Sequence, residues 1–180
     1  MHKKQLLATF VLFGCVTMFE CNWWPWRDAR DIRKFVNTTA PVWTYLTSEM
    51  TNIECKVDEY IVMAAEYVKF LRSYYRGRER FSYKLLAKFD SVRKKRMTIS
   101  SPGGTIKQTE DIVYMSRDLS CAVVKVTTST KGIQKTYDLR IRDSAIHVRP
   151  QSKCMEHFRW KAGRQGYLLY RDYCRNLQRS

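Results

Sequence analysis

Hydrophobic and polar positions alternate with a period of two along much of the chain. The pattern is clearest between Cys121 and Cys154, where the runs CAVVKVTT and QKTYDLRIR lie on either side of Thr130-Lys131-Gly132. Successive side chains of a β-strand point to opposite faces of a sheet. Two such runs around a glycine-bearing turn therefore predict an antiparallel hairpin with two chemically different faces.

The same period recurs in shorter runs elsewhere. The pattern predicts strands over residues 41–47, 55–58, 66–75, 81–89, 93–100, 110–115, 121–127 and 134–142. Between the second and third of these, Glu59–Ala65 favours a helix by propensity. Helices are also predicted over Asp28–Val36, with Asp28 as the N-cap, and over Ser152–Lys161. Tyr167–Tyr170 then leads in extended form towards Cys174.

About eight short strands without regularly alternating helices indicate an all-β fold. The economical arrangement is an eight-stranded antiparallel up-and-down barrel with short N- and C-terminal helices, because closure removes the exposed sheet edges. The interior of such a barrel holds one small ligand. A two-sheet sandwich fits the same strand pattern but offers no comparable cavity.

The first residues resemble a secretory signal peptide. MHKK is followed by an apolar run, LLATFVLFGCV, which is too short to span a membrane. Cleavage after Thr17 leaves small residues, Thr17 and Cys15, at the −1 and −3 positions, whereas cleavage after Cys21 places Phe19 at −3. We therefore expect a signal peptide over residues 1–17, ending at 21 in the alternative, a single domain over 22–180, and a secreted, extracellular protein.

Cysteine usage agrees with export. Cys15 leaves with the leader and Cys21 depends on the cleavage site, which leaves Cys55, Cys121, Cys154 and Cys174. Four cysteines in a secreted domain predict two disulfides, with three connectivities open. A metal site at Cys154 and His157 is a weaker alternative because a CxxC partner is lacking. We expect no metal and no cofactor.

The chain is strongly basic, with a formal net charge of +16. Basic residues cluster at Arg76–Arg80 and Arg93–Arg96. In an exported protein such clusters contact heparan-type glycans or anionic surfaces more often than nucleic acid, although solubility alone also explains them. Asn37-Thr38-Thr39 is an N-glycosylation sequon. We expect a monomer that binds neither nucleic acid nor membrane.

Known catalytic motifs are missing from the sequence. GxSxG, HExxH, P-loop and GxGxxG patterns do not occur. Adjacent carboxylates such as Asp58 with Glu59, or Glu110 with Asp111, point apart on a strand. We therefore expect a binding protein and not an enzyme.

Several segments resemble the tick salivary lipocalins of the histamine-binding family. These are the leader, DARDIRKF, VWTY, CKVD, SYY, DIVYMSRDLSCAVVKV, YDLRIRDSAI and the two late cysteines. The resemblance covers essentially the whole mature chain and is looser between Arg76 and Gln108. It implies an eight-stranded barrel with disulfides Cys55–Cys174 and Cys121–Cys154. It also implies a salivary protein that suppresses host defence by sequestering histamine or another biogenic amine.

The resemblance further implies a frame for ligand contacts. Amine-binding members share Cys-Asp-aliphatic, Glu-Leu-aromatic and Cys, which correspond here to Cys121-Ala122-Val123, Asp138-Leu139-Arg140 and Cys154. Ala122 replaces the first carboxylate, and Arg140 replaces the aromatic ring that would contact a cation. Since a buried amine needs a carboxylate partner, we expect weak histamine binding. The alternative ligand is an anionic lipid, a fatty acid or leukotriene-like molecule, paired with Arg140 or Arg142.

The candidate ligand-binding residues are Asp138, Arg140, Trp43 and Tyr45. Trp43 and Tyr45 offer ring contacts, although a core tryptophan at the barrel floor is the simpler interpretation. Asp138 and Arg140 equally fit a surface ion pair. The sequence does not place the other candidate carboxylates, which are Asp58, Glu66, Glu110 and Asp111. A barrel that serves only as a scaffold for cationic glycan or protein binding is a further hypothesis.

Overall fold

The strands form one continuous antiparallel sheet that closes on itself. The computed structural model describes residues 30–179 except 105, 130–131, 148–151 and 164–165. The expected leader, Cys21, the expected cap Asp28 and most of the turn after residue 129 lie outside these residues. The strands are β1 (Val42–Thr47), β2 (Ile53–Met63), β3 (Tyr67–Arg76), β4 (Glu79–Phe89), β5 (Arg96–Ser100), β6 (Lys107–Met115), β7 (Cys121–Thr128), β8 (Gln134–Arg142) and β9 (Tyr167–Leu168).

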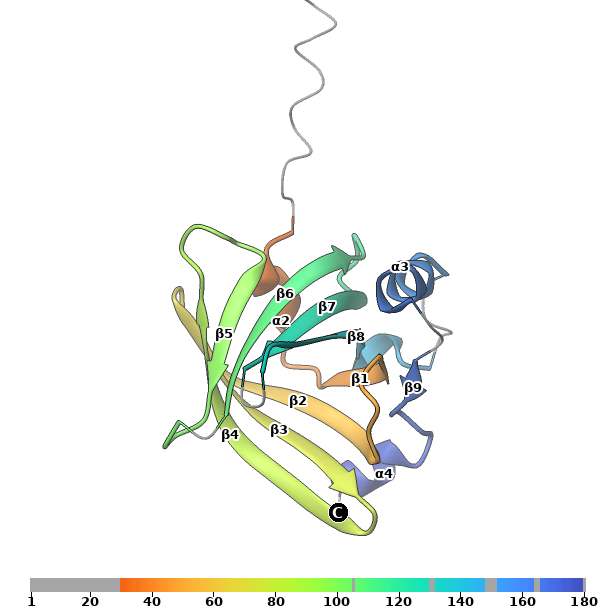
Figure 1. Cartoon of the computed structure of the whole chain (residues 1–180). Coiled ribbons are helices and arrows are strands. Elements are labelled where there is room, and N and C mark those ends of the chain that lie inside the picture. The colour runs from red at the N-terminus through yellow and green to blue at the C-terminus, as the bar shows by residue number, and fades with distance from the viewer. Residues whose placement is uncertain (1–29, 105, 130–131, 148–151, 164–165, 180) are drawn as a thin grey trace, which may run out of the picture.

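Neighbouring strands pair in chain order, and a seam between β1 and β2 closes the barrel. The sheet order is β2-β3-β4-β5-β6-β7-β8-β1-β9, with a further β1–β2 pairing. The seam is short, with Val42 opposite Asp58 and Trp43 opposite Val57. Farther along β1, its free edge takes up the two-residue strand β9. The predicted eight-stranded up-and-down barrel is confirmed, and β9 is an addition on its outside (Figure 1).

The expected helix over Glu59–Ala65 is wrong. This stretch continues β2 as far as Met63, and Tyr60 pairs with Phe70 of β3. A backbone ladder and the burial of alternate side chains outweigh a weak intrinsic helix preference. The strand expected over 55–58 is therefore the middle of an eleven-residue strand.

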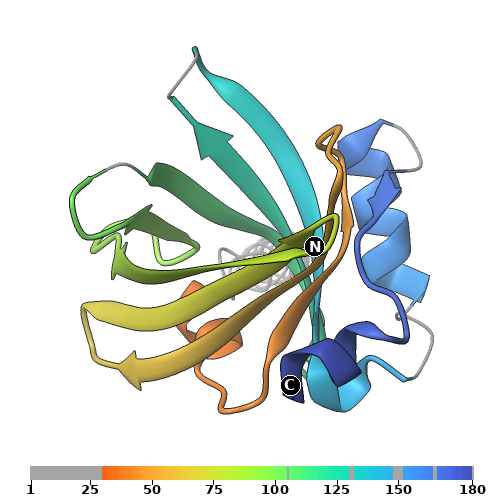
Figure 2. The same ribbon diagram turned by 90° about the horizontal axis from the view of Figure 1, so that it is seen from below.

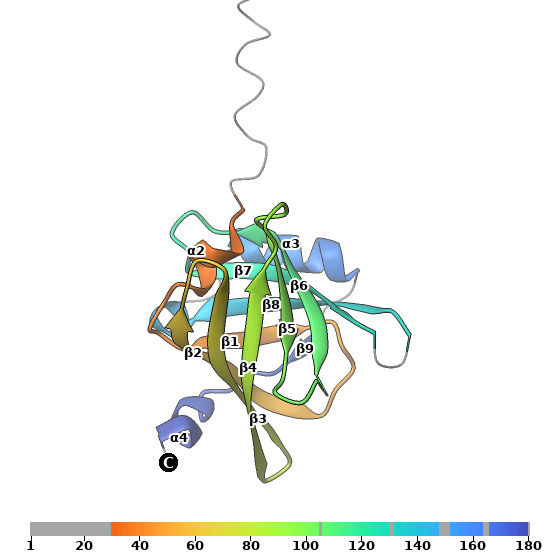
Figure 3. The same cartoon turned by 90° about the vertical axis from the view of Figure 1, so that its left-hand side faces the viewer.

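Short helices lie at one end of the barrel and along one side of it. Helix α2 (Ile32–Val36) is capped by Asp31, whose carboxylate accepts from the Arg33 backbone N–H at 3.1 Å. It begins later than predicted and covers the barrel end opposite the β3–β4 hairpin (Figure 1 and Figure 3). Helix α3 (Ser152–Ala162) matches its prediction within one residue, and α4 (Cys174–Arg179) was not predicted. None of the described helices is long and apolar enough to cross a membrane.

Buried apolar side chains form two clusters, one on each face of the sheet. The inner cluster fills the barrel and includes Ala122, Val124 and Val126 of β7 together with the buried face of α2. The outer cluster lies beneath α3 and the C-terminal segment and includes Cys121 and Val123 from the same strand. Figure 2 shows α3 on the outside of the sheet. Both faces of β7 are therefore buried, which explains its nearly continuous apolar sequence.

Both disulfides fasten this outer layer to the barrel. Cys55 of β2 is bonded to Cys174 of α4, and Cys121 of β7 is bonded to Cys154 of α3. These are the two pairs that the family resemblance implies. Because Cys154 is bonded to Cys121, the pair formed by Cys154 and His157 is not available to a metal. His157 instead stacks on Tyr114, with 3.9 Å between ring centroids.

Removing either disulfide is expected to lower the free energy of unfolding, and the bond between Cys55 and Cys174 should cost more. It closes a sequence separation of 119 residues, against 33 for the other. On the chain-entropy model these correspond to about 5 and about 4 kcal/mol. Urea unfolding of the two double cysteine-to-alanine variants measures the difference. A larger loss for the bond between Cys121 and Cys154 would contradict the expectation.

Candidate ligand site in the barrel interior

The inner face of β8 carries charge, and its outer face is apolar. Leu139 and Ile141 belong to the outer cluster, so their neighbours Asp138 and Arg140 point into the barrel. Asp138 and Arg140 are each only 1% exposed. They are therefore an interior pair and not the surface pair that the sequence also allowed.

Arg140 lies at the centre of a buried ion network. Its two terminal nitrogens bond both oxygens of Glu110 at 2.6 and 2.7 Å. They also approach Asp138 at 3.3 Å and Asp58 at 3.5 Å. Arg72 binds the two oxygens of Asp58 at 2.6 and 2.7 Å and reaches Glu110 at 3.1 Å. The interior thus holds two guanidinium groups that share three carboxylates.

Lys56 completes the balance of charge. Its ammonium group lies 3.1 Å from Asp138, which also accepts from the Thr47 hydroxyl at 2.8 Å. Gln108 donates to Glu110 at 2.7 Å. We call Lys56, Asp58, Arg72, Glu110, Asp138 and Arg140 the ion cluster. Its three cations and three carboxylates carry no net charge when all are ionised.

The shifts in pKa follow from this pairing. Burial alone raises the pKa of Glu110, but the charges of Arg140 and Arg72 outweigh it and lower the value from 4.5 to about 2. Burial likewise opposes ionisation of Asp138, and Lys56 and Arg140 nevertheless lower its pKa. The pKa values of Arg140 and Arg72 are raised because attraction to the carboxylates exceeds the cost of burial. Every group with a resolved shift in the cluster is therefore held in its charged form.

Away from the ion cluster, the barrel interior is lined by apolar side chains. The inner cluster includes Val68 and Phe70 of β3, Leu85 of β4, Ile99 of β5 and Ile112 of β6. Two of these strands also carry members of the ion cluster, Arg72 on β3 and Glu110 on β6, so charged and apolar positions line the same interior. An interior of this kind suits a molecule with one polar end and an apolar remainder.

Trp43 and Tyr45 lie on the other side of the sheet. Trp43 belongs to the outer cluster, its indole nitrogen donates to Asp143 at 2.8 Å, and its ring meets Tyr170 edge-on at 5.2 Å. Tyr45 stacks on Tyr170 at 6.2 Å. The structure therefore does not bring these two rings together with Asp138 and Arg140. Trp43 is a core residue beneath the C-terminal segment.

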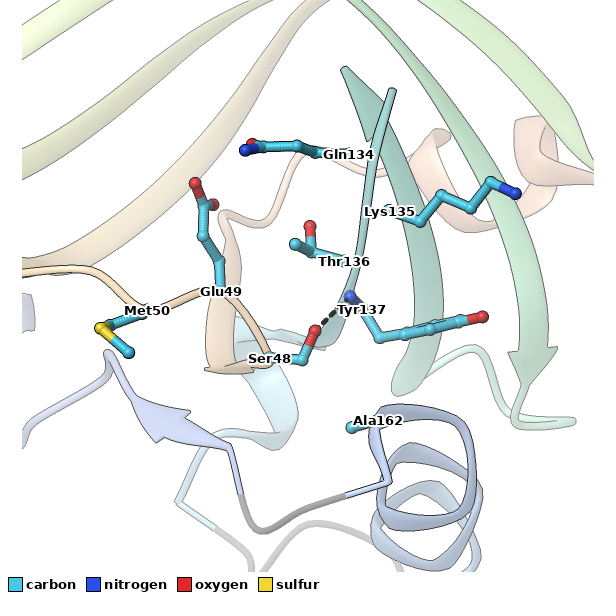
Figure 4. Close-up of a pocket in the computed structure, with 8 residues that line it drawn as sticks. All are labelled: Ser48, Glu49, Met50, Gln134, Lys135, Thr136, Tyr137 and Ala162. Carbon is cyan, nitrogen blue, oxygen red and sulfur yellow. Dashed lines mark hydrogen bonds between the residues drawn. The ribbon is translucent and has the colours of Figure 1, made fainter. Parts of the chain in front are cut away.

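A pocket opens at the barrel end away from α2. It has a volume of about 560 Å³ and lies between the segment that follows β1 and the start of β8. Figure 4 shows Gln134 and Thr136 pointing to one side of β8, with Lys135 and Tyr137 pointing to the other. Thr136 lies on the same strand face as Asp138, one step nearer the opening. The pocket is thus lined by residues from both faces of β8 and by Ala162 of α3.

The sequence offered Asp58 and Glu110 only as candidate carboxylates without a placement, and it did not single out Arg72. They come from β2, β3 and β6 and meet only because the barrel closes. Strand parity carried a usable signal, since Arg72 shares its face with Phe70 and Glu110 shares its face with Ile112. A charged residue on an apolar strand face indicates either a misplaced strand or a buried partner.

Asn37 is exposed at the C-terminal end of α2, and its glycosylation stays a prediction. Among the residues that the structure describes, no group of three or more His, Cys, Asp or Glu side chains is placed to hold a metal ion.

Comparison with known proteins identifies the fold as that of the lipocalins. The AM182 serotonin complex superposes with a TM-score of 0.62 at 17% identity, covering 79% of this chain and 91% of that one. Lipocalin 12 from rat epididymis gives 0.53 at 13% identity, over 81% and 87% of the two chains. The siderocalin Ex-FABP gives 0.54 at 12% identity, over 69% and 84%. No family model matches the sequence, and no curated protein does.

The chain therefore has the lipocalin fold, a closed barrel that binds small ligands in other proteins. At these identities the likeness extends to the fold alone.

Replacing Glu110 by Gln is expected to lower the free energy of unfolding by about 3–5 kcal/mol near neutral pH. The change leaves Arg140 and Arg72 short of one buried negative charge. Glu79→Gln, on the exposed β3–β4 hairpin, is the matched control and should change little. Urea unfolding monitored by fluorescence measures both variants.

The same pair of variants should differ in pH dependence. The pKa of Glu110 is depressed in the folded state, so its contribution is complete above its ordinary value of 4.5 and is lost as pH falls towards about 2. The unaltered protein and Glu79→Gln should lose more stability between pH 5 and pH 3 than Glu110→Gln does. Equal losses in all three would contradict the assigned pKa of Glu110.

Proposed function

We propose that the protein sequesters a small amphipathic molecule in its barrel, without chemical turnover. The observation that carries this proposal is a barrel interior that combines apolar side chains with a buried set of charges. The lipocalin fold supports it, because that fold is built around one central ligand cavity. The resemblance to tick salivary lipocalins supports a secreted protein that removes a host mediator, and this setting is part of the proposal.

The electrostatics favour an anionic or hydrogen-bond-accepting ligand over an amine. Asp58, Glu110 and Asp138 are all already bonded to buried cations. A protonated amine pairs with one of these carboxylates only if it displaces the arginine or lysine already bonded there. The displaced cation is then buried without a partner, which is strongly unfavourable. Ala122 lies directly opposite Arg140, but its methyl side chain supplies no further carboxylate. A fatty acid or leukotriene-like lipid is therefore our preferred ligand class, with histamine or another biogenic amine as the family-based alternative.

Histamine is expected to bind weakly or not at all, because the interior has no carboxylate to spare for it. Isothermal titration calorimetry of the purified protein with histamine measures this directly. The serotonin of the AM182 complex makes serotonin the second amine to test. Sub-micromolar affinity for either amine would contradict the argument from charge balance.

A double variant tests the same argument by restoring the groups that an amine needs. Ala122→Asp combined with Arg140→Trp adds one carboxylate, removes one cation and restores the ring at the position that the family frame implies. Amine affinity should then rise at least tenfold over the unaltered protein. Ala122→Asp alone is the matched control, since its new carboxylate lies opposite Arg140 and is neutralised.

A second candidate function is glycan binding through the tip of the β3–β4 hairpin. Arg76, Arg78 and Arg80 are all exposed there, beside a single acid, Glu79. The other basic cluster is partly neutralised, with Arg93 paired to Asp90 and Arg96 paired to Asp111.

The two basic clusters do not form one surface. They lie at opposite ends of β4 (Figure 3), a strand of eleven residues and so roughly 33 Å long. A glycan site would therefore consist of the hairpin tip alone.

We expect the tip to confer at most weak, salt-sensitive heparin binding. Charge reversal at Arg78 and Arg80 to Glu should shift elution from a heparin column to lower salt. The same reversal at Lys94, at the opposite end of the barrel, is the control. Elution well above physiological salt, lost in the Arg78 and Arg80 variant, would favour the glycan function over the carrier function.

A further inference from the structure

Three buried hydrogen-bond donors in the barrel have no partner. These are the hydroxyl of Tyr60 and the Nε atoms of Arg140 and Arg142, each inaccessible to solvent and unbonded within the described chain. Proteins almost always pair buried donors with an acceptor, so each exception calls for an explanation. Arg140 in particular is 1% exposed and uses its terminal nitrogens entirely on the ion cluster.

The three groups lie at the same end of the interior, next to α2. Arg142 is opposite Val42 on one side of β1, and Asp58 is opposite Val42 on the other. Tyr60 follows Asp58 on the same strand face and packs against the inner cluster. Arg140 reaches Asp58 at 3.5 Å. Strands β8, β1 and β2 thus bring the three donors to one region, where the small side chain of Val42 lies between them.

Electrostatic coupling supports the same placement. Burial is the largest cause that raises the pKa of the Tyr60 hydroxyl, Asp58 raises it further, and Arg140 opposes the rise. Burial is the largest cause that lowers the pKa of Arg142, and the electrostatic effect of Tyr60 comes next and raises it. The phenol therefore interacts with both arginines.

The three unpartnered groups share one chemical property. All three groups donate, and two of them belong to guanidinium ions. The ion cluster balances Arg140, but Arg142 is not part of it. Its Nη2 donates to the carbonyl oxygens of Lys34 and Phe35, and its guanidinium lies 5.6 Å from the Phe35 ring centre. Asp58 and Asp118 lie near enough to act on the pKa values of Tyr60 and Arg142, but neither accepts a hydrogen bond from any of the three unpartnered atoms.

We propose that Tyr60 Oη, Arg140 Nε and Arg142 Nε form a subsite for a monovalent anion. Its occupant is the carboxylate of an acyl ligand or a chloride ion. The acyl case rests on the proposed function: the chain would lie along Val68, Phe70 and Leu85, which continue from Tyr60 across β3 and β4. A water molecule accepts two hydrogen bonds, whereas three donors are left without a partner here.

Tyr60→Phe tests the subsite because it removes one hydroxyl and keeps the ring. The delipidated protein is titrated with sodium dodecanoate by calorimetry in gluconate buffer. We expect the unaltered protein to bind and Tyr60→Phe to bind at least tenfold more weakly, since a hydrogen bond to a charged acceptor is lost. Tyr45→Phe makes the same chemical change in the outer cluster and should leave the affinity unchanged.

Stability without ligand separates a binding role from a structural one. The Tyr60 hydroxyl has no hydrogen-bond partner within the described chain, so Tyr60→Phe should unfold at the same or higher urea concentration than the unaltered protein. Arg142→Gln, a second variant, should also weaken dodecanoate binding. A lower unfolding midpoint for Tyr60→Phe in gluconate would assign the hydroxyl a structural role and overturn the subsite.

Chloride distinguishes the two occupants. At constant ionic strength, replacing gluconate by chloride should raise the unfolding midpoint of the unaltered protein, but not of Tyr60→Phe, if chloride fills the subsite. A chloride response without dodecanoate binding supports the subsite and contradicts the acyl carrier. Dodecanoate binding that Tyr60→Phe leaves intact overturns the subsite and leaves the carrier function standing. Failure of both probes with the unaltered protein overturns both proposals.

Discussion

The bidentate pair between Arg140 and Glu110 is the interaction on which the interior of this barrel depends. Both side chains are fully buried and bond through two short contacts. Removing two charges from water costs several kcal/mol each, and their attraction offsets this only when the geometry is good and further hydrogen bonds are made. Arg72, Gln108 and Asp138 supply those further bonds. The cluster is thus held together as a unit, and a change at one member leaves another uncompensated.

On our proposal, this constraint decides which ligands the barrel accepts. A barrel lined only by apolar residues discriminates among ligands mainly by shape, whereas buried charges must be matched. Because the carboxylates of the cluster are already paired, an amine finds no partner. The unpaired donors near α2, in contrast, favour a ligand group that accepts hydrogen bonds. The disulfides and α3 act from outside, since they bury the apolar face of β8 and so keep Asp138 and Arg140 turned inward.

The sequence predicted the barrel better than it predicted the site. Strand alternation located all eight barrel strands, and the family resemblance implied both disulfides. The exception, Glu59–Ala65, shows where local propensity failed, because pairing of Tyr60 with Phe70 is a tertiary contact. Strand ends were also displaced by a few residues, as at β6, which begins at Lys107.

At the candidate site, Asp138 and Arg140 were placed together from the sequence because they lie on one strand face. Their partners were not, because Asp58 and Glu110 are distant in sequence and become neighbours only across a closed interior. Trp43 shows the reverse problem. Its parity on β1 is readable from the sequence, but which face of β1 points inward is decided by α3 and the C-terminal segment.

The central claim is that the interior selects for a negative or electron-rich head group and against a cation. Native mass spectrometry of the unaltered protein, incubated with equal concentrations of dodecanoate and dodecylamine, tests it most directly because the two ligands share one alkyl chain. We expect the protein to retain dodecanoate at one molecule per chain. Retention of dodecylamine in its place would contradict it.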